Sequence, residues 1–336
     1  MAVHLKPIAD QVVVITGASS GIGLATARAA AKKGAKVVLA ARNGAALAEI
    51  EQQIREAGGE AAHVVADVGK RDDVQRLADT AMSRFGGFDT WVNNAGVGIF
   101  GRLDEVSDED NFQLFQTNFW GLVYGSQIAA AHLKTRGGAL INMGSVASDI
   151  GLPMQGMYGA SKHAIKGFTD AFRMELVADG APISVTLIKP TSINTPFPRH
   201  AKNYTDRAQM LPPPVYAPEE VANAILHAAV HGGRDIYVGG AGRILSTAQK
   251  LAPRTMDMIG QRMIGLEFRD GPPGDRRGAL HAAGEDGSVW GDEPGYTMRT
   301  SLYTRASMHP VLTGTLAAAA GLAVLALLRR GGKGRL

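Results

Sequence analysis

This sequence lacks cysteine, and its basic and acidic residues are nearly equal in number. None of the 336 residues is Cys, which excludes disulfides, thiol nucleophiles and metal sites built from thiolates. The 35 basic and 31 acidic residues leave a formal net charge of +4, an excess too small to indicate a nucleic-acid partner. The sequence also contains no internal repeat of the kind that predicts a solenoid.

Two further absences concern targeting and metals. No long apolar run precedes the first predicted strand, so we expect no secretory signal and predict a cytoplasmic catalytic domain that is not secreted. His227 and His231 are four residues apart on a predicted helix, a spacing that suits metal ligands. Because no acidic residue completes a zinc-protease pattern, we assign no metal.

Short apolar segments alternate with helical stretches over the first two-thirds of the chain. Such alternation predicts an α/β fold, in which a parallel sheet has helices on both faces and right-handed crossovers. Long helices are expected at residues 110–134 and 156–179. The expected strands lie near residues 11–16, 36–41, 62–66, 88–93, 138–143, 183–189 and 235–238.

A glycine-rich turn follows the first of these strands. The apolar run at residues 12–15 leads into Thr16-Gly17-Ala18-Ser19-Ser20-Gly21-Ile22-Gly23, and a helical stretch follows. This strand–turn–helix context is the one that a dinucleotide site requires. Gly17 permits the tight turn, Gly21 lets the backbone approach a pyrophosphate, and Gly23 lets the helix pack close to the strand. The N–H groups at the start of the helix can then bind the phosphates.

A tyrosine and a lysine have the spacing of neighbours on one helix face. Tyr158 and Lys162 are four residues apart, and Ser145 lies thirteen positions before the tyrosine. Free tyrosine has a pKa of about 10, and a nearby ammonium favours the phenolate and lowers that value. The pair therefore predicts an acid that works near neutral pH and exchanges a proton with a carbonyl or an alcohol.

Five features follow one another in a specific order: Thr16-Gly17-x-x-x-Gly21-x-Gly23, Asn93-Asn94-Ala95-Gly96, Asn118, Ser145 and Tyr158-x-x-x-Lys162. Over residues 8–240 the chain resembles the short-chain dehydrogenase/reductase family. The resemblance implies a doubly wound Rossmann fold with a seven-stranded, mostly parallel sheet. It also implies an oxidoreductase that moves hydride between a nicotinamide and a carbonyl or secondary alcohol.

The resemblance also assigns roles to four residues. Tyr158 would be the general acid/base, and Lys162 would lower the pKa of that tyrosine and bind the nicotinamide ribose. Ser145 would hold and polarise the substrate oxygen. Asn118 would anchor a water that relays protons through Lys162. By the same resemblance, the cofactor-binding residues are Gly17, Ser19, Ser20, Gly21, Ile22, Gly23, Arg42, Asp67, Val68, Asn94, Ala95, Gly96, Tyr158, Lys162, Pro190, Ile193 and Thr195.

The end of the second strand indicates which nicotinamide cofactor is bound. An acidic residue there would bind the ribose 2′-hydroxyl and repel a 2′-phosphate. This chain has Ala41 at that position and Arg42 after it, and a guanidinium pairs well with phosphate. We therefore expect NADP(H), with NAD(H) as the alternative if Arg42 is a solvated loop cation.

The segment at residues 194–214 is expected to be a mobile lid over the substrate. Its apolar residues, together with others expected near the active site, predict a lipophilic substrate, although some of them could be ordinary core. These residues are Pro196, Phe197, Pro198, Tyr204, Met210, Leu211, Pro212, Pro213, Pro214, Phe100, Leu152, Met154 and Met157. The resemblance implies a homo-oligomer formed through the two long helices.

Beyond a catalytic domain at residues 1–240, we expect an extension at 241–308 and a separate C-terminal segment at 309–336. Residues 270–300 are rich in Gly, Pro and charge, which is typical of a loop or disordered linker. Residues 311–328 carry no charge and would reach about 27 Å as a helix, barely enough to cross a bilayer. We predict a membrane anchor there, with an alanine-rich helix docked on the enzyme as the alternative.

Two other functions stay open on the sequence alone. One is a membrane-tethered NADP-binding sensor or scaffold without turnover, and the other is an isomerase or dehydratase on the same fold. The four residues Asn118, Ser145, Tyr158 and Lys162 favour the oxidoreductase, because a pure binding protein would not need all of them.

Overall fold

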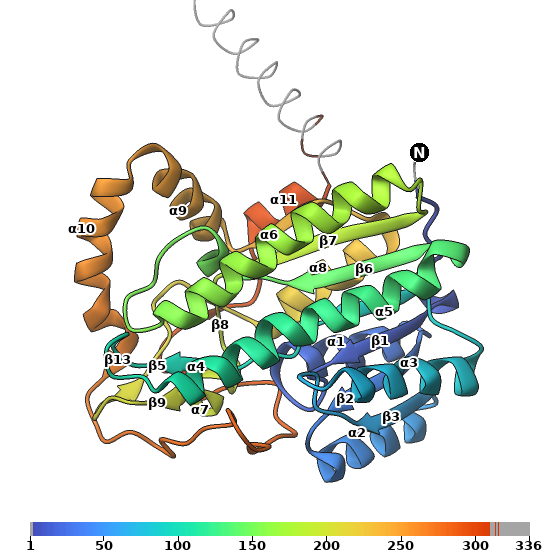
Figure 1. The fold of residues 1–336 in the computed structure, drawn as a ribbon, viewed down its shortest axis with the longest axis horizontal. Coiled ribbons are helices and arrows are strands. Elements are labelled where there is room, and N and C mark those ends of the chain that lie inside the picture. Colours follow the sequence, from blue (N-terminus) through green and yellow to red (C-terminus); the bar gives the residue numbers. More distant parts are fainter. Residues whose placement is uncertain (1–2, 310–312, 314, 316–336) are drawn as a thin grey trace, which may run out of the picture.

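The computed structural model describes residues 3–309, 313 and 315. Its centre is a sheet of seven parallel strands in the order β12-β7-β6-β4-β1-β2-β3 (Figure 1). These strands are β1 (Val12–Thr16), β2 (Lys36–Ala41), β3 (Ala61–Val65), β4 (Thr90–Asn93), β6 (Gly138–Met143), β7 (Ile183–Pro190) and β12 (Asp235–Val238). The predicted fold is confirmed, and each predicted strand agrees within two residues.

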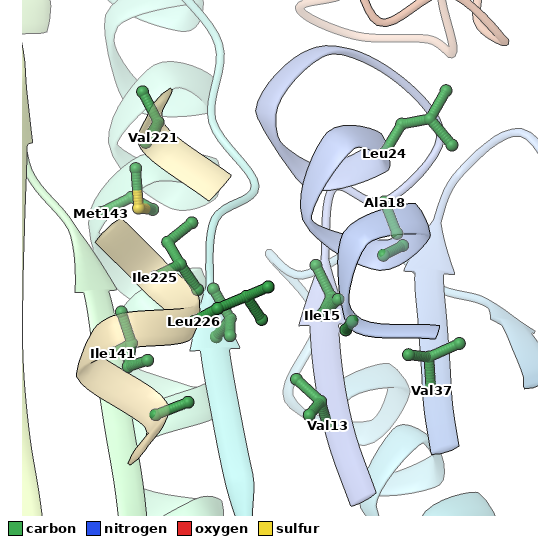
Figure 2. Close-up of a cluster of buried hydrophobic side chains, with 14 of the residues drawn as sticks. Val13, Ile15, Ala18, Leu24, Val37, Ile141, Met143, Val221, Ile225 and Leu226 are labelled. Carbon is green, nitrogen blue, oxygen red and sulfur yellow. The ribbon is translucent and has the colours of Figure 1, made fainter. Parts of the chain in front are cut away.

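Both faces of the sheet are covered by helices. One face packs on α1 (Gly21–Lys32), α2 (Gly44–Glu56) and α8 (Pro218–His231), and the other on α3 (Arg71–Phe85), α5 (Gly121–Arg136) and α6 (Gly156–Ala178). All five residues of β1 are buried, since parallel strands between two helical layers need apolar side chains on both sides. Figure 2 shows the first face, where β1 side chains meet Leu24 of α1 and strand β6 lies against Val221, Ile225 and Leu226 of α8.

The helix predicted at residues 110–134 is interrupted in the middle. It consists of α4 (Asp108–Phe115), a π-helical segment (Gln116–Trp120) and α5, with no break in the chain direction. Asn118 lies in the π-helical segment, a local widening that often occurs at functional sites. The second predicted long helix is α6, which is continuous.

The extension is built into the segment that was predicted to be a lid. Strand β13 (Phe268–Arg269) pairs with β10 (Ala208–Gln209), and β14 (Thr297–Met298) pairs with β11 (Val215–Tyr216), which also pairs with β8 (Ser192–Ile193). The other short elements are β5 (Ile99–Phe100), β9 (Lys202–Asn203), α7 (Phe197–His200), α9 (Gly240–Leu251), α10 (Pro253–Met263) and α11 (Leu302–Met308). Two small sheets therefore join residues 192–216 to the extension (Figure 1, orange).

Apart from strand β14, residues 270–300 form a loop, which is one of the two predicted alternatives. This loop is packed against the rest of the protein. Leu280 is fully buried and packs against Val97, Ile99 and Leu114, and Ala279 beside it is also buried. Of the two predicted alternatives, the structure has the loop, and these apolar side chains anchor a sequence whose composition resembles that of disordered segments.

The apolar stretch predicted to be a membrane anchor, residues 311–328, lies outside the described residues except for Thr313 and Thr315. Within the part of the chain that the structure describes, no helix combines the length and apolar character needed to cross a bilayer.

Candidate active site

A cavity of about 340 Å³ opens at the carboxyl ends of the central strands. Strand order reverses there, since β1 has β2 on one side and β4 on the other, and doubly wound sheets bind ligands at such a point. With the exceptions of Gly23 and Asn118, every residue that the sequence assigned to catalysis or cofactor binding lines this cavity. The structure therefore brings together residues from position 17 to position 195.

The glycine-rich turn forms one end of the cavity. Gly17 and Gly21 have positive φ angles of 65° and 53°, which only glycine adopts at little cost. Gly23 lies behind the turn, where a Cβ atom would stand 2.0 Å from the carbonyl oxygen of Gly17. Asn94, at the end of β4, donates its side-chain amide to the carbonyl oxygens of Thr16 and Gly17 at 2.9 and 3.1 Å. The turn is thus held from two sides with the start of α1 facing the cavity.

Ser145, Tyr158 and Lys162 meet at another part of the cavity. The Ser145 hydroxyl, just beyond β6, lies close enough to the Tyr158 phenol to lower its pKa, against the larger effect of burial. The Lys162 ammonium lies 5.6 Å from the centre of the Tyr158 ring and donates to the carbonyl oxygen of Met143 at 2.9 Å. The Phe197 ring, at 5.5 Å from the Tyr158 ring, encloses the phenol further.

Burial changes the acid–base properties of this pair. It raises the pKa of Tyr158 to about 12 and lowers the pKa of Lys162 to about 8, because a buried site disfavours the charged form of each group. The sequence-based prediction that the ammonium lowers the pKa of the phenol is therefore wrong for this geometry. Tyr158 is protonated at neutral pH and can donate its proton.

Asn118 does not line the cavity. Its side-chain oxygen accepts a hydrogen bond from the Val97 backbone at 2.8 Å, and its amide donates to the Val97 carbonyl at 2.9 Å and to the Ser161 hydroxyl at 3.2 Å. The side chain thus ties the loop after β4 to α6, beside Lys162. Its role in a proton-relaying water chain stays a prediction.

A segment of the extension, residues 279–291, crosses the cofactor end of the cavity, and we call it the strap. Arg42 donates to the backbone carbonyls of Ala279 and Leu280, in the second case at 3.2 Å. The strap also meets the glycine-rich turn, because the Gly21 N–H donates to the Ser288 carbonyl at 2.9 Å and the Gly287 N–H donates to the Ser19 carbonyl at 2.8 Å. Its residues that line the cavity are Ala279, Ala283, Gly284 and Asp286.

No feature of the sequence predicted that the extension reaches this site. Besides the strap, Ala241 and Leu245 of α9 and Glu267 after α10 line the cavity. The composition of residues 270–300 predicted a loop, but no local pattern predicts which cavity a loop covers. Strap residues that bind Arg42 are more than 230 positions away from it in sequence.

The residues predicted to form a lipophilic pocket divide into two groups. Phe100 and Met154 pack with Ala201 and Phe268 in a separate core cluster, and Tyr204 hydrogen-bonds with Asp110; none of these three lines the cavity, nor do Met157, Pro198 and Met210. Side chains that do line it are Leu152, Pro196, Phe197, Leu211, Pro212, Pro213 and Pro214. Part of the predicted pocket is therefore core, because Phe100 of β5 packs against Phe268 of β13 and not into the cavity.

Comparison with known proteins agrees with this geometry. The family model for the short chain dehydrogenase matches residues 11–206, more than half of the chain. The chain belongs to the short-chain dehydrogenase family. It is therefore an enzyme, an oxidoreductase that acts on CH–OH or C=O groups.

Two similar proteins differ in how much of this short-chain dehydrogenase they cover. An uncharacterized oxidoreductase of Bacillus subtilis, YxnA, is 46% identical over 97% of this chain and 92% of its own length. The 11-beta-hydroxysteroid dehydrogenase A of Sesamum indicum is 34% identical over 76% of this chain and 75% of its own. Similarity to YxnA thus includes the extension almost entirely.

Two solved structures share the fold. An alcohol dehydrogenase from the archaeon Thermococcus sibiricus, complexed with 5-hydroxy-NADP, superposes with a TM-score of 0.61 at 28% identity and covers 68% of this chain and 95% of its own. A short chain dehydrogenase/reductase from Burkholderia phymatum, in complex with NAD, gives a TM-score of 0.64 at 26% identity and covers 80% and 99%.

Proposed function

We propose that this protein is an NADP(H)-dependent oxidoreductase for a lipophilic carbonyl or secondary alcohol, with Tyr158 as its general acid/base. The observation that carries the proposal is the convergence of the glycine-rich turn with Ser145, Tyr158 and Lys162 on one cavity. The turn and the start of α1 suit a pyrophosphate, and Lys162 is placed to bind the nicotinamide ribose. A bound nicotinamide supplies or accepts the hydride.

The chain's own residues handle the proton. In the direction of reduction, the substrate oxygen gains negative charge as the carbonyl carbon is reduced, and Tyr158 gives its proton to that oxygen. The high pKa of the phenol keeps this proton in place until then. The Ser145 hydroxyl orients the oxygen. Lys162 lies beside the phenol, with its ammonium 5.6 Å from the ring centre.

Arg42 is the residue that favours NADP(H). It lines the cavity after Ala41, which has no charge to repel a 2′-phosphate. A guanidinium has five N–H groups, and the strap carbonyls accept from only part of them. The neighbour solved with 5-hydroxy-NADP supports this choice, and the neighbour solved with NAD makes a direct comparison of the two cofactors necessary.

A lipophilic substrate is supported by the apolar side chains around the catalytic tyrosine. Leu152, Phe197 and Leu211 line the cavity, and one relative is named for the oxidation of a hydroxysteroid. Apolar surface of this kind binds ligands mainly by removing their apolar area from water.

Steady-state consumption of NADPH and of NADH with a panel of apolar ketones tests the proposal. We expect net consumption that depends on the ketone and is faster with NADPH at low cofactor concentration. A sensor or scaffold would bind NADPH without consuming it, and an isomerase or dehydratase would convert substrate without net consumption. Either of these results would refute the proposed reaction.

We also propose a homo-oligomer formed through α4, α5 and α6. Helices α4 and α6 expose large apolar side chains, with Phe112 74%, Met174 67% and Val177 71% exposed. Apolar side chains that gather on one face can mark a protein–protein interaction surface. Light scattering coupled to size-exclusion chromatography would report a monomer if this surface has no partner copy.

A further inference from the structure

One buried carboxyl group in the cavity has no task in the reaction described above. Glu267 follows α10 and precedes β13, and it is only 1% exposed. Its backbone is fixed because its carbonyl oxygen accepts a hydrogen bond from the Met210 N–H at 2.9 Å. Glu267 is one of the residues that line the same cavity as Ser145 and Tyr158.

One carboxylate oxygen of Glu267 is unsatisfied. Gln155 lies close enough to oppose the effect of burial on the pKa of this carboxyl, but among the described residues the Oε2 atom is buried and has no hydrogen-bond partner. No Lys, Arg or His in the described part of the chain forms an ion pair with it. Burial accordingly raises the pKa of Glu267 to about 7.

The position of Gln155 places this carboxyl near the reaction. Gln155 precedes α6, and its carbonyl oxygen accepts from the Gly159 N–H at 2.8 Å. It comes three residues before Tyr158, which puts the two about one helical turn apart. Glu267 therefore lies near the end of α6 that carries the catalytic phenol, and the apolar residues Leu152, Leu211 and Leu245 line the same cavity.

An unpartnered acceptor in an apolar enclosure costs stability unless something binds it. We propose that Glu267 accepts a hydrogen bond from the substrate, from a hydroxyl or amine that the apolar body carries away from its reacting carbonyl. The substrate class is then a lipophilic ketone or alcohol with a second, hydrogen-bond-donating group. This inference rests on the proposed function and assigns substrate selection to the extension, outside the residues matched by the family model.

Three apolar ketones that differ only at the far end, in a hydroxyl, an amine or a methyl group, test the inference. We expect the wild-type enzyme to prefer the hydroxyl or the amine over the methyl compound by about 10- to 100-fold in kcat/KM, mainly through KM. The substitution Glu267→Leu should reduce that preference to less than about 3-fold, because it removes the acceptor.

The near-isosteric substitution Glu267→Gln separates the two donors. Its amide oxygen still accepts a hydrogen bond, so preference for the hydroxyl compound should persist. Preference for the amine should fall further than preference for the hydroxyl, because a protonated amine also loses its attraction to the carboxylate charge. A matched control is Asp257→Asn, which removes an exposed carboxylate of α10 and should leave all three ratios unchanged.

The outcomes separate the two proposals. If the wild-type enzyme consumes NADPH or NADH with the methyl ketone and shows no preference for either donor, the role of Glu267 is refuted while the reaction stands. If no ketone is consumed with either cofactor, the proposed function itself fails. A wild-type preference that persists in Glu267→Leu also refutes the role of Glu267. Absence of any wild-type preference refutes it without a variant, so a variant that does not fold would not protect the inference.

Discussion

Replacing Glu267 with glutamine should make the protein more stable at high pH, even though it removes a charged group. In the folded chain, burial raises the pKa of this carboxyl to about 7 from an ordinary value of 4.5. The folded state therefore holds a proton that the unfolded state has already lost between these two values. Stability falls as pH rises through that window, since the unfolded state binds fewer protons.

The size of this effect follows from the two pKa values. At about 1.4 kcal/mol for each pKa unit, the rise from 4.5 to about 7 makes the ionised carboxyl cost up to about 3 kcal/mol at pH 8. At pH 4 both states are mostly protonated and the cost is near zero. Relative to the wild type, Glu267→Gln should therefore gain up to about 3 kcal/mol between pH 4 and pH 8, since glutamine has no proton to lose.

Urea unfolding followed by circular dichroism at several pH values measures this difference. Comparing two proteins at each pH cancels the titration of the other carboxyl groups. The control Asp257→Asn replaces an exposed carboxylate of α10 and measures the effect of an amide substitution outside the cavity. A stability difference between Glu267→Gln and wild type that stays flat from pH 4 to pH 8 would show that the carboxyl finds a partner or water that this geometry lacks.

Three further results are expected. Tyr158→Phe should lower kcat by about 10²- to 10⁴-fold, the usual contribution of a general acid. It should leave NADPH affinity, measured by fluorescence titration, within about 2-fold of the wild type. Full activity of this variant would refute the role of the phenol. Arg42→Ala should weaken NADPH binding by about 10-fold or more, as loss of a charge-assisted hydrogen bond does. It should leave NADH binding unchanged. An equal loss of affinity for both cofactors would mean that Arg42 only holds the strap. Trp290→Ala removes the indole N–H of the strap that donates to Glu219 at 3.0 Å. Because the strap covers the cofactor end of the cavity, its loosening should speed NADPH release, as measured by stopped flow. The control Tyr296→Ala, an 83% exposed side chain of the same extension, should leave that rate unchanged.

The parts of the fold and site that the sequence predicted all depend on short-range patterns. Strand β1 could be predicted because its residues are a continuous β-branched run, which suits a strand buried on both faces. The glycine-rich turn could be predicted because Gly17 and Gly21 take positive φ angles that other residues avoid. Tyr158 and Lys162 share a cavity because their spacing of four suits one helix face.

What the sequence did not predict depends on contacts between distant residues. Leu280 packs into a core cluster with Val97, and this contact converts a segment of disordered composition into a fixed strap. The direction of the pKa shift of Tyr158 was also missed, because burial is set by the surrounding elements, Phe197 among them, and not by the neighbouring Lys162.

The strap bears on the choice between NADP(H) and NAD(H), because it reaches the cavity where β2 ends. Ala41 offers no carboxylate there, which favours NADP(H), but Asp286 of the strap lines the same cavity. Burial lowers the pKa of Arg42, and Asp67 and Asp286 oppose that effect, so both carboxylates act on the guanidinium. A 2′-phosphate would gain from Arg42 and be repelled by Asp286, whereas a 2′-hydroxyl could donate to that carboxylate. The ratio of NADPH to NADH affinity in Asp286→Asn, compared with that in Arg42→Ala, measures which charge decides. A ratio that rises in the first variant and falls in the second would mean that the extension and the Rossmann core set cofactor preference together.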